Sequence, residues 1–401
     1  MMTMHAGKMR DTISPRDLKA RAGVMAEAAA AAADAVDQES RFPAEAYAQA
    51  KGQRLLGIQA PIELGGEAAS VSDVVDICYM LGRACASTAM IFAMHQIMVR
   101  ILVRHAPDSA YHQSLLRRLC AEQLLLASST TDGQGGGNLR ASTAAVESTG
   151  AGIALVKNAT VISYGAEADG IVTTARRAPD AAASDQVLVA FTKADYQLRP
   201  IMTWNALGMR GTCSSGYALK AQGGVDQVLP EPYQRIHAHT MMPVAHLTWS
   251  GVWTGVAAGA VDRAKQFVRK AARGSGGQMP PGATHLTRAT ASLRALRGMV
   301  AAALAQYESA AARPDAMESF DFQTSMNLLK VNASELATAT VMSALQTCGL
   351  AGYRNDGEVS IARYVRDILS TSIMINNDRI LASTANAAML AEIPALLRDV
   401  A

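Results

Sequence analysis

The chain has 401 residues, of which half are hydrophobic and 18% are charged, and its formal net charge is only +3. This length predicts two or three domains, or one large composite unit, with enough apolar residues for a substantial core. The balanced charge, without a dense run of Lys and Arg, argues against a nucleic-acid-binding protein.

The five cysteines are scattered along the chain and form no CxxC pair. This distribution argues against a disulfide framework or a zinc site and indicates a reducing compartment. The N-terminus lacks the apolar segment of a signal peptide, and no apolar run reaches the length of about 20 residues that a membrane span needs. We therefore expect a cytoplasmic protein without a membrane partner.

The first part of the chain, residues 1–121, predicts a helical domain. Residues 61–87 contain a Gly-Gly turn and then an amphipathic helix that begins at Ser and Asp residues suited to capping. Residues 90–106 are nearly all apolar, which is typical of a buried helix.

The character of the sequence changes after this domain. Short runs rich in Val, Thr and Ile, separated by Gly, Asp and Asn, predict a β domain over residues 122–236. Residues 237–401 again predict helices, with a long periodic run at 247–273 that ends in a Gly- and Pro-rich break at 274–284. Neither a P-loop nor a GxGxxG motif after a strand is present, so a nucleotide-binding α/β fold is not expected.

Three motifs occur in a familiar order: RFPAEAYAQAKGQRLLGIQAPIELGG (41–66), WNALGMRGTCSSGYAL (204–219) and LQTCGLAGYRNDGEVSIARYVRD (345–367). They resemble signatures of the acyl-CoA dehydrogenase family, and the resemblance covers nearly the whole chain. It implies an α+β fold with an N-terminal helical domain, a middle β-barrel or sandwich and a C-terminal four-helix bundle. It also implies an FAD cofactor.

The resemblance assigns the flavin contacts residue by residue. Thr130 stands where the family bonds the pyrimidine edge of the flavin. Ile162 and Ser163 match the step beside the isoalloxazine, where a hydroxyl or backbone N–H can reach the N5 region. Ordinary packing within strands is the alternative role for Thr130 and Ser163.

A second group of residues matches the contacts to the other half of FAD. Gln346, Gly349 and Gly352 correspond to the turn that meets the adenine–pyrophosphate end, often from a neighbouring subunit, which implies a homodimer or homotetramer. Arg273 stands near a family Arg, although the Phe-Gly that usually follows it is missing, and Leu350 replaces a usual glycine. A plain helix end with a left-handed glycine is the alternative for this turn.

The catalytic glutamate of the family is missing from both of its known positions. Members of the family use this carboxylate to remove the α proton of an acyl thioester, and the two positions carry Ile375 and Ala245 here. His246 and His95 are the candidate replacements, because imidazole titrates near neutral pH. For each of them, a structural histidine held by backbone partners is the alternative.

These features lead to three hypotheses about function. The first is an FAD-dependent α,β-dehydrogenation of an acyl thioester, on CoA or a carrier protein, with a non-standard base and an electron-transfer partner. Met94, Ile375 and Asn376 would then line the substrate pocket. The second is a flavin monooxygenase of the same fold, which receives reduced flavin from a partner reductase and has His95 and Ser163 beside it. The third is an inactive subunit of a hetero-oligomer.

Overall fold

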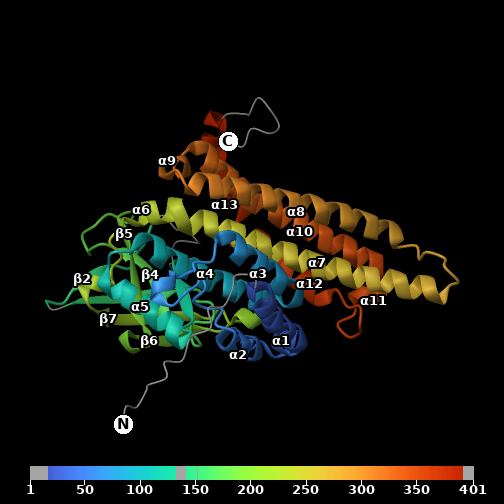
Figure 1. Ribbon diagram of the computed structural model, residues 1–401, viewed down its shortest axis with the longest axis horizontal. Coiled ribbons are helices and arrows are strands. Elements are labelled where there is room, and N and C mark those ends of the chain that lie inside the picture. The colour runs from blue at the N-terminus through green and yellow to red at the C-terminus, as the bar shows by residue number, and fades with distance from the viewer. Residues whose placement is uncertain (1–16, 132–140, 151, 392–401) are drawn as a thin grey trace, which may run out of the picture.

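A computed structural model describes residues 17–131, 141–150 and 152–391, and it has helices at both ends of the chain with two sheets between them (Figure 1). This arrangement confirms the predicted α+β fold class. The long C-terminal helices extend well beyond the β region, so the two ends of the bundle lie in different surroundings (Figure 1).

The N-terminal helices are α1 (Leu18–Glu39), α2 (Ala44–Gly52), α3 (Val71–Ala84), α4 (Ala86–His105) and α5 (Ala110–Glu122). Helix α3 begins at the expected cap, where Ser70 and Asp73 bond reciprocally to each other's backbone N–H. Among the described helices, α4 alone is long and apolar enough to cross a membrane, and most of it is buried within the protein. It is thus the buried helix that the sequence predicts.

The strands are β1 (Leu126–Ser129), β2 (Val146–Ser148), β3 (Ile153–Ala159), β4 (Gly170–Arg176), β5 (Gln186–Thr192), β6 (Tyr196–Met202) and β7 (Gly216–Gly223). In the described chain they form a three-stranded sheet of order β1-β4-β5 and a four-stranded sheet of order β2-β3-β7-β6. Strands β1 and β4 run parallel, and the other pairs run antiparallel.

The C-terminal helices are α6 (Tyr233–Ile236), α7 (Met242–Gly274), α8 (Ala283–Ala311), α9 (Pro314–Met317), α10 (Phe320–Cys348), α11 (Leu350–Tyr353), α12 (Ala362–Ile368) and α13 (Asn377–Leu390). A π-helical turn at His237–Met241 joins α6 to α7. Helix α10 packs against α7, α8 and α13, and these four helices form the bundle (Figure 1).

The N-terminal domain is joined to the bundle where α3 crosses α7. A Cβ atom on Gly82 would lie 2.3 Å from the carbonyl oxygen of Val252, and one on Gly255 would lie 2.3 Å from that of Tyr79. Neither helix could approach so closely with a side chain at these positions. The two glycines therefore fix how the N-terminal domain sits on α7.

Candidate active site

The position where the resemblance places the catalytic glutamate is a strained turn. Ile375 lies between a 3₁₀ turn (Leu369–Ser372) and α13, and its φ of 47° is in the left-handed region. A β-branched residue rarely adopts this conformation, and such strain is concentrated at functional sites. The side chain of Ile375 cannot accept a proton, so it contributes apolar surface to this turn and does not act as a base.

A buried lysine side chain is hydrogen-bonded to the strained turn. Lys330 of α10 donates from Nζ to the carbonyl oxygens of Thr371 and Ile375, at 3.0 and 2.7 Å, and to Oδ1 of Asn377 at 2.7 Å. The ammonium also lies 5.7 Å from the ring centre of Trp253. Burial lowers the pKa of Lys330 to about 8, because no carboxylate among the described residues compensates the lost hydration.

The second family position for the base is Ala245, on α7, with His246 beside it. His246 is buried, and its Nδ1 lies 2.9 Å from the carbonyl oxygen of Met326. A carbonyl oxygen only accepts, so Nδ1 carries the proton and Nε2 is left as the basic atom. Burial, with Lys330 nearby, lowers the pKa of His246 to about 3. The ring is therefore a weak base in this site.

His95, on α4, is bonded to the backbone on both sides. Its Nδ1 accepts from the N–H of Leu126 at 3.0 Å, and its Nε2 lies 2.8 Å from the carbonyl oxygen of Leu56. Burial lowers its pKa to about 4. Since neither ring nitrogen is available to a substrate, the geometry argues against the predicted role of His95 as a base and favours the structural alternative.

The residues predicted to contact the flavin lie around the end of β1 and the turn after β3. Ile162 is fully buried and Ser163 is nearly so. Tyr164 ties this turn to β1, because its hydroxyl donates to the carbonyl oxygen of Leu126 at 2.9 Å. Thr130 follows β1 directly and is half-buried.

Ser163 continues into a chain of hydroxyl groups that the sequence did not predict. Its Oγ lies 2.8 Å from Oγ of Ser214, which lies 2.7 Å from Oγ1 of Thr212. Thr212 in turn donates to the carbonyl oxygen of Met209 at 2.8 Å. The N–H of Met209 donates to Oδ1 of Asp367 at 2.7 Å, which connects the turn to α12.

Asp367 belongs to the Arg-Asp pair of the third family motif. The side chain is buried, and burial raises its pKa to about 6 despite the attraction of Arg363. Its acceptance of the Met209 N–H shows a structural role: it joins the β domain to the helix that leads to the Ile375 turn.

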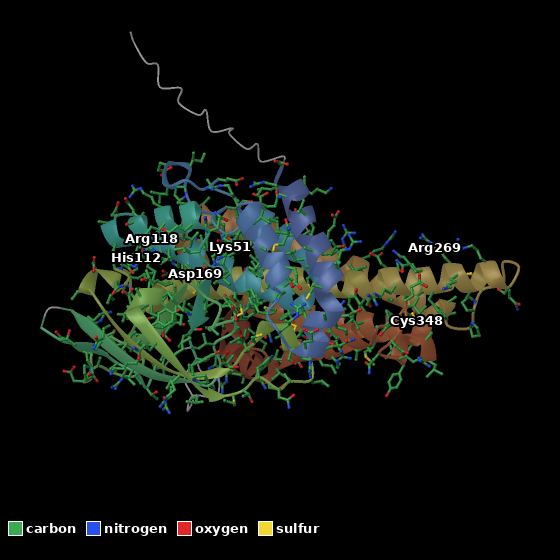
Figure 2. The ribbon with its side chains drawn as sticks, turned by 90° about the horizontal axis from the view of Figure 1, so that it is seen from below. Lys51, His112, Arg118, Asp169, Arg269 and Cys348 are labelled. Atoms are coloured by element: carbon green, nitrogen blue, oxygen red, sulfur yellow. The ribbon has the colours of Figure 1, made fainter. Side chains whose placement is uncertain are left out.

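The residues predicted to contact the adenine half of the cofactor lie elsewhere. Gln346 and Gly349 end α10, next to Cys348, and they are exposed, as is Arg273 at the end of α7. Figure 2 labels Cys348 at one end of the molecule and Asp169, which precedes β4, toward the other. Gly349 has a positive φ of 54°, but its ψ of −137° lies outside the αL conformation that the helix-end alternative describes, and Gly352 is buried. The described residues show no hydrogen bond between this group and Ser163.

The remaining predicted pocket residues are Met94 and Asn376. Met94 precedes His95 on α4 and is partly buried against the core. Asn376 is exposed and caps α13, where its Oδ1 accepts the N–H of Arg379 at 3.2 Å. Asn376 thus has a clear structural function in beginning α13, directly after the strained turn.

Two family models match the sequence, and together they cover well over half of it. They are the acyl-CoA dehydrogenase N-terminal domain, over residues 17–123, and the acyl-CoA dehydrogenase C-terminal domain, over residues 238–390. The chain belongs to the acyl-CoA dehydrogenase family. No curated protein matches the sequence.

Solved structures of this fold include enzymes with different reactions. A nitrososynthase from Micromonospora carbonacea var. africana has 22% identity and a TM-score of 0.79, with 94% of this chain and 98% of that chain covered. Dibenzothiophene monooxygenase TdsC from Paenibacillus sp. A11-2 has 17% identity and a TM-score of 0.80, with 95% and 98% covered. A glutaryl-coenzyme A dehydrogenase has 17% identity and a TM-score of 0.78, with 96% and 98% covered. At these identities the similarity shows the fold that the acyl-CoA dehydrogenase family shares.

The Ser163 turn of this acyl-CoA dehydrogenase family member fits the edge of a flavin. The backbone N–H of Ser163 has no acceptor among the described residues. The hydroxyl of the same residue is hydrogen-bonded to Ser214. The side chain of Ile162 is fully buried and holds the turn in the core, so the backbone N–H and hydroxyl oxygen of Ser163 are the groups of this turn that suit the polar edge of a ring.

Proposed function

We propose that the protein is a flavin-dependent monooxygenase that takes reduced flavin from a separate reductase and transfers one oxygen atom to a small molecule. The observation that carries the proposal is the loss of the base. Ile375 and Ala245 fill both family positions, His95 is bonded through both ring nitrogens, and His246 is buried with a pKa of about 3. Removal of an α proton needs a positioned acceptor. Transfer of one oxygen atom from molecular oxygen, with the second atom reduced to water by the two electrons of the reduced flavin, involves no α proton.

When bound in its reduced form, the flavin supplies the two electrons that activate molecular oxygen. The chain supplies the surroundings. Thr130 and Ser163 would orient the ring edge, and the fully buried side chain of Ile162 would hold the Ser163 turn in place. Lys330 fixes the Ile375 turn as an apolar wall, which keeps water from the reacting atoms.

The descriptions of three similar structures support this assignment. The nitrososynthase, FMN-bound TdsC and a methanesulfinate monooxygenase from Pseudomonas fluorescens share the fold and act on nitrogen- or sulfur-containing molecules, as their names state. The sequence resemblance implies FAD, and TdsC is described with FMN, so both flavins are candidates. A cytosolic location, a partner reductase and a homo-oligomeric state are parts of the same proposal.

Acyl-thioester dehydrogenation is the competing function. The glutaryl-coenzyme A dehydrogenase shares the fold, and Nε2 of His246 has no hydrogen-bond partner among the described residues. This nitrogen is the best remaining acceptor in the chain. Its pKa of about 3 makes it a poor base at neutral pH, so we rank this function second.

The two functions can be distinguished by the reaction of the bound flavin. A dehydrogenase substrate reduces the flavin, whereas a monooxygenase needs reduced flavin and molecular oxygen. The protein is loaded with FMN or with FAD and tested in two ways. Under anaerobic conditions it is mixed with glutaryl-CoA and with straight-chain acyl-CoAs. In air it is supplied with NADH, a flavin reductase and dibenzothiophene, methanesulfinate or indole. A product heavier by one oxygen supports the monooxygenase. Bleaching of the flavin by an acyl-CoA contradicts it, as does a failure to bind either flavin.

A further inference from the structure

The hydroxyl chain at the candidate flavin edge has a fixed direction. The carbonyl oxygen of Met209 can only accept, so the hydroxyl proton of Thr212 points to it, at 2.8 Å. Thr212 has one such proton, and it must therefore be the acceptor in its 2.7 Å bond with Ser214. Ser214 has then used its own proton, and it must accept from Ser163 at 2.8 Å.

The consequence is that Ser163 has no hydroxyl proton left for a ligand. Its Oγ offers lone pairs only, while its backbone N–H remains a free donor among the described residues. The three hydroxyl side chains are nearly fully buried, so water does not readily reorder them.

The backbone around the chain is held in unusual conformations. Tyr164, Met209 and Cys213 all have positive φ, at 44°, 53° and 47°. Both backbone groups of Met209 are hydrogen-bonded. Its carbonyl oxygen also accepts from Nε1 of Trp204 at 3.1 Å, and its N–H donates to Asp367. Strained backbone persists only where the surroundings hold it firmly, which is the condition for a pre-organised site.

We infer that the chain from Ser163 through Ser214 to Thr212 makes the site selective for the reduced form of the flavin. The inference rests on the proposed function, with the N5 edge of the ring against Ser163 as the family resemblance implies. Reduced flavin has an N–H at N5 and a carbonyl oxygen at C4 beside it. This donor and acceptor match the acceptor Oγ and the donor N–H of Ser163.

Oxidised flavin presents a different edge. Its N5 carries a lone pair, so both adjacent atoms are acceptors and one of them would face the lone pairs of Ser163. One hydrogen bond gained in one state and an unfavourable contact in the other correspond to a preference of about tenfold. Such a preference suits an enzyme that receives flavin already reduced and releases it after oxidation.

The preference is measured by binding and does not require turnover. The midpoint potential of FMN is determined free and bound, and a tenfold preference for the reduced form raises it by about 30 mV. In Thr212→Val, Ser214 loses its acceptor and can donate to Ser163, which frees the proton of Ser163 for the ligand. We expect the shift to vanish in this variant and in Ser163→Ala.

Two further variants make the test decisive. Ser214→Ala removes the acceptor of Ser163 and frees its proton in the same way, so it replaces Thr212→Val if that variant fails to fold. Thr290→Val is the matched control, because among the described residues the hydroxyl of Thr290 bonds only within its own helix α8, to the carbonyl oxygen of Leu286 at 2.8 Å. It should keep the parent's shift.

The outcomes separate this inference from the proposed function. If the parent binds both redox states of FMN equally, or if Thr212→Val and Ser214→Ala keep the parent's shift, the inference is overturned while the monooxygenase proposal stands. If neither FMN nor FAD binds in either redox state, both are overturned. A raised potential that falls in the three site variants and not in the control supports the inference.

Discussion

His95 shows how a histidine in a buried helix becomes part of the backbone hydrogen bonding. Its ring joins the N–H of Leu126 to the carbonyl oxygen of Leu56 and so links α4 to the start of β1. A proton on Nδ1 would break the first of these bonds. The low pKa of about 4 follows from burial. Burial also means that loss of either hydrogen bond would lower the stability of the folded protein.

We predict that His95→Ala destabilises the protein and does not act as the loss of a base. The variant leaves the buried backbone N–H of Leu126 without its acceptor, and such a group costs about 1–3 kcal/mol. The carbonyl oxygen of Leu56 loses its shorter bond and keeps only the 3.3 Å bond from Nε2 of Gln96. Urea denaturation measures the loss. His285→Ala is the control, since Nδ1 of His285 has no partner among the described residues and little should change. A variant of normal stability that has lost only flavin reduction by acyl-CoA would contradict this prediction.

Asp367 carries a charge that its buried position disfavours. We predict that Asp367→Asn stabilises the protein at neutral pH by about 2–3 kcal/mol, because each unit of pKa shift corresponds to about 1.4 kcal/mol. Burial raises the pKa of Asp367 to about 6, so above pH 6 the folded chain holds an ionised group that is more stable in the unfolded chain. Asn keeps the acceptor for the N–H of Met209 without the charge.

The sign of the pH dependence follows from the raised pKa. As the pH falls from about 6 to the ordinary value near 4, folded Asp367 binds a proton before the unfolded chain does, so the parent gains stability. The advantage of the Asn variant should therefore be constant above pH 6 and disappear near pH 4. Denaturation at several pH values measures it. A less stable Asn variant at pH 7 would mean that attraction to Arg363 outweighs burial.

The candidate site could be predicted from sequence only where a motif names the residue. Ser163 was found in this way, but its partner Ser214 is 51 positions away, and no local pattern links the two. Lys330 gave a weak signal, a single lysine among the apolar residues of α10, and it was missed because its partners lie 41 to 47 positions further along. The role of His95 also depends on such distant partners.

At the scale of elements, Lys330 connects α10 to the turn that precedes α13. We predict that Lys330→Met destabilises the protein by several kcal/mol, because two carbonyl groups and the amide of Asn377 lose their donor in a buried place. Methionine keeps most of the apolar stem, so packing changes little. Denaturation measures the loss, and hydrogen exchange should rise first in residues 371–377.

A lysine on the surface provides the control for this variant. Lys265→Met, on α7, removes an exposed ion pair with Asp262 at 3.9 Å, and such pairs contribute about 0–1 kcal/mol. Equal effects of the two substitutions, or uniform exchange along α13 and the turn, would show that the ammonium of Lys330 does not hold the Ile375 turn.

The elements themselves followed from periodicity where the sequence had a strong pattern. The apolar run of α4 and the capped start of α3 were predicted, and both are present. Strand β6 lies within the predicted β domain, but its sequence YQLRPIM alternates apolar and polar residues only up to Pro200. It is an edge strand with a register shift between Pro200 and Met202, where proline is tolerated. The π-helical turn before α7, HAHTM, has no distinguishing sequence pattern.

At the scale of the whole molecule, apolar side chains remain exposed on the C-terminal helices. On α13, Leu381 is 44% exposed and Met389 is 78% exposed, and on α11 Leu350 and Tyr353 are also largely exposed. Helix α13 projects at one end of the bundle and α11 lies toward the other (Figure 1). Exposed apolar surface on helices is typical of a contact with another protein, so we expect these helices to be covered in an assembly.

We predict that the protein is a homodimer or homotetramer in which these helices are buried. The family resemblance implies that the turn at Gln346–Gly352 completes the cofactor site of a neighbouring subunit, and the exposed apolar residues of α11 and α13 provide surface for such a contact. Leu381→Glu with Met389→Glu places charges on α13 that an apolar interface would have to bury unpaired, and the assembly should dissociate into smaller species. Light scattering at micromolar concentration measures the mass, with Val156→Glu, an exposed position on β3, as the control. A monomeric parent that binds FAD fully would contradict the prediction, because one chain would then hold both halves of the cofactor.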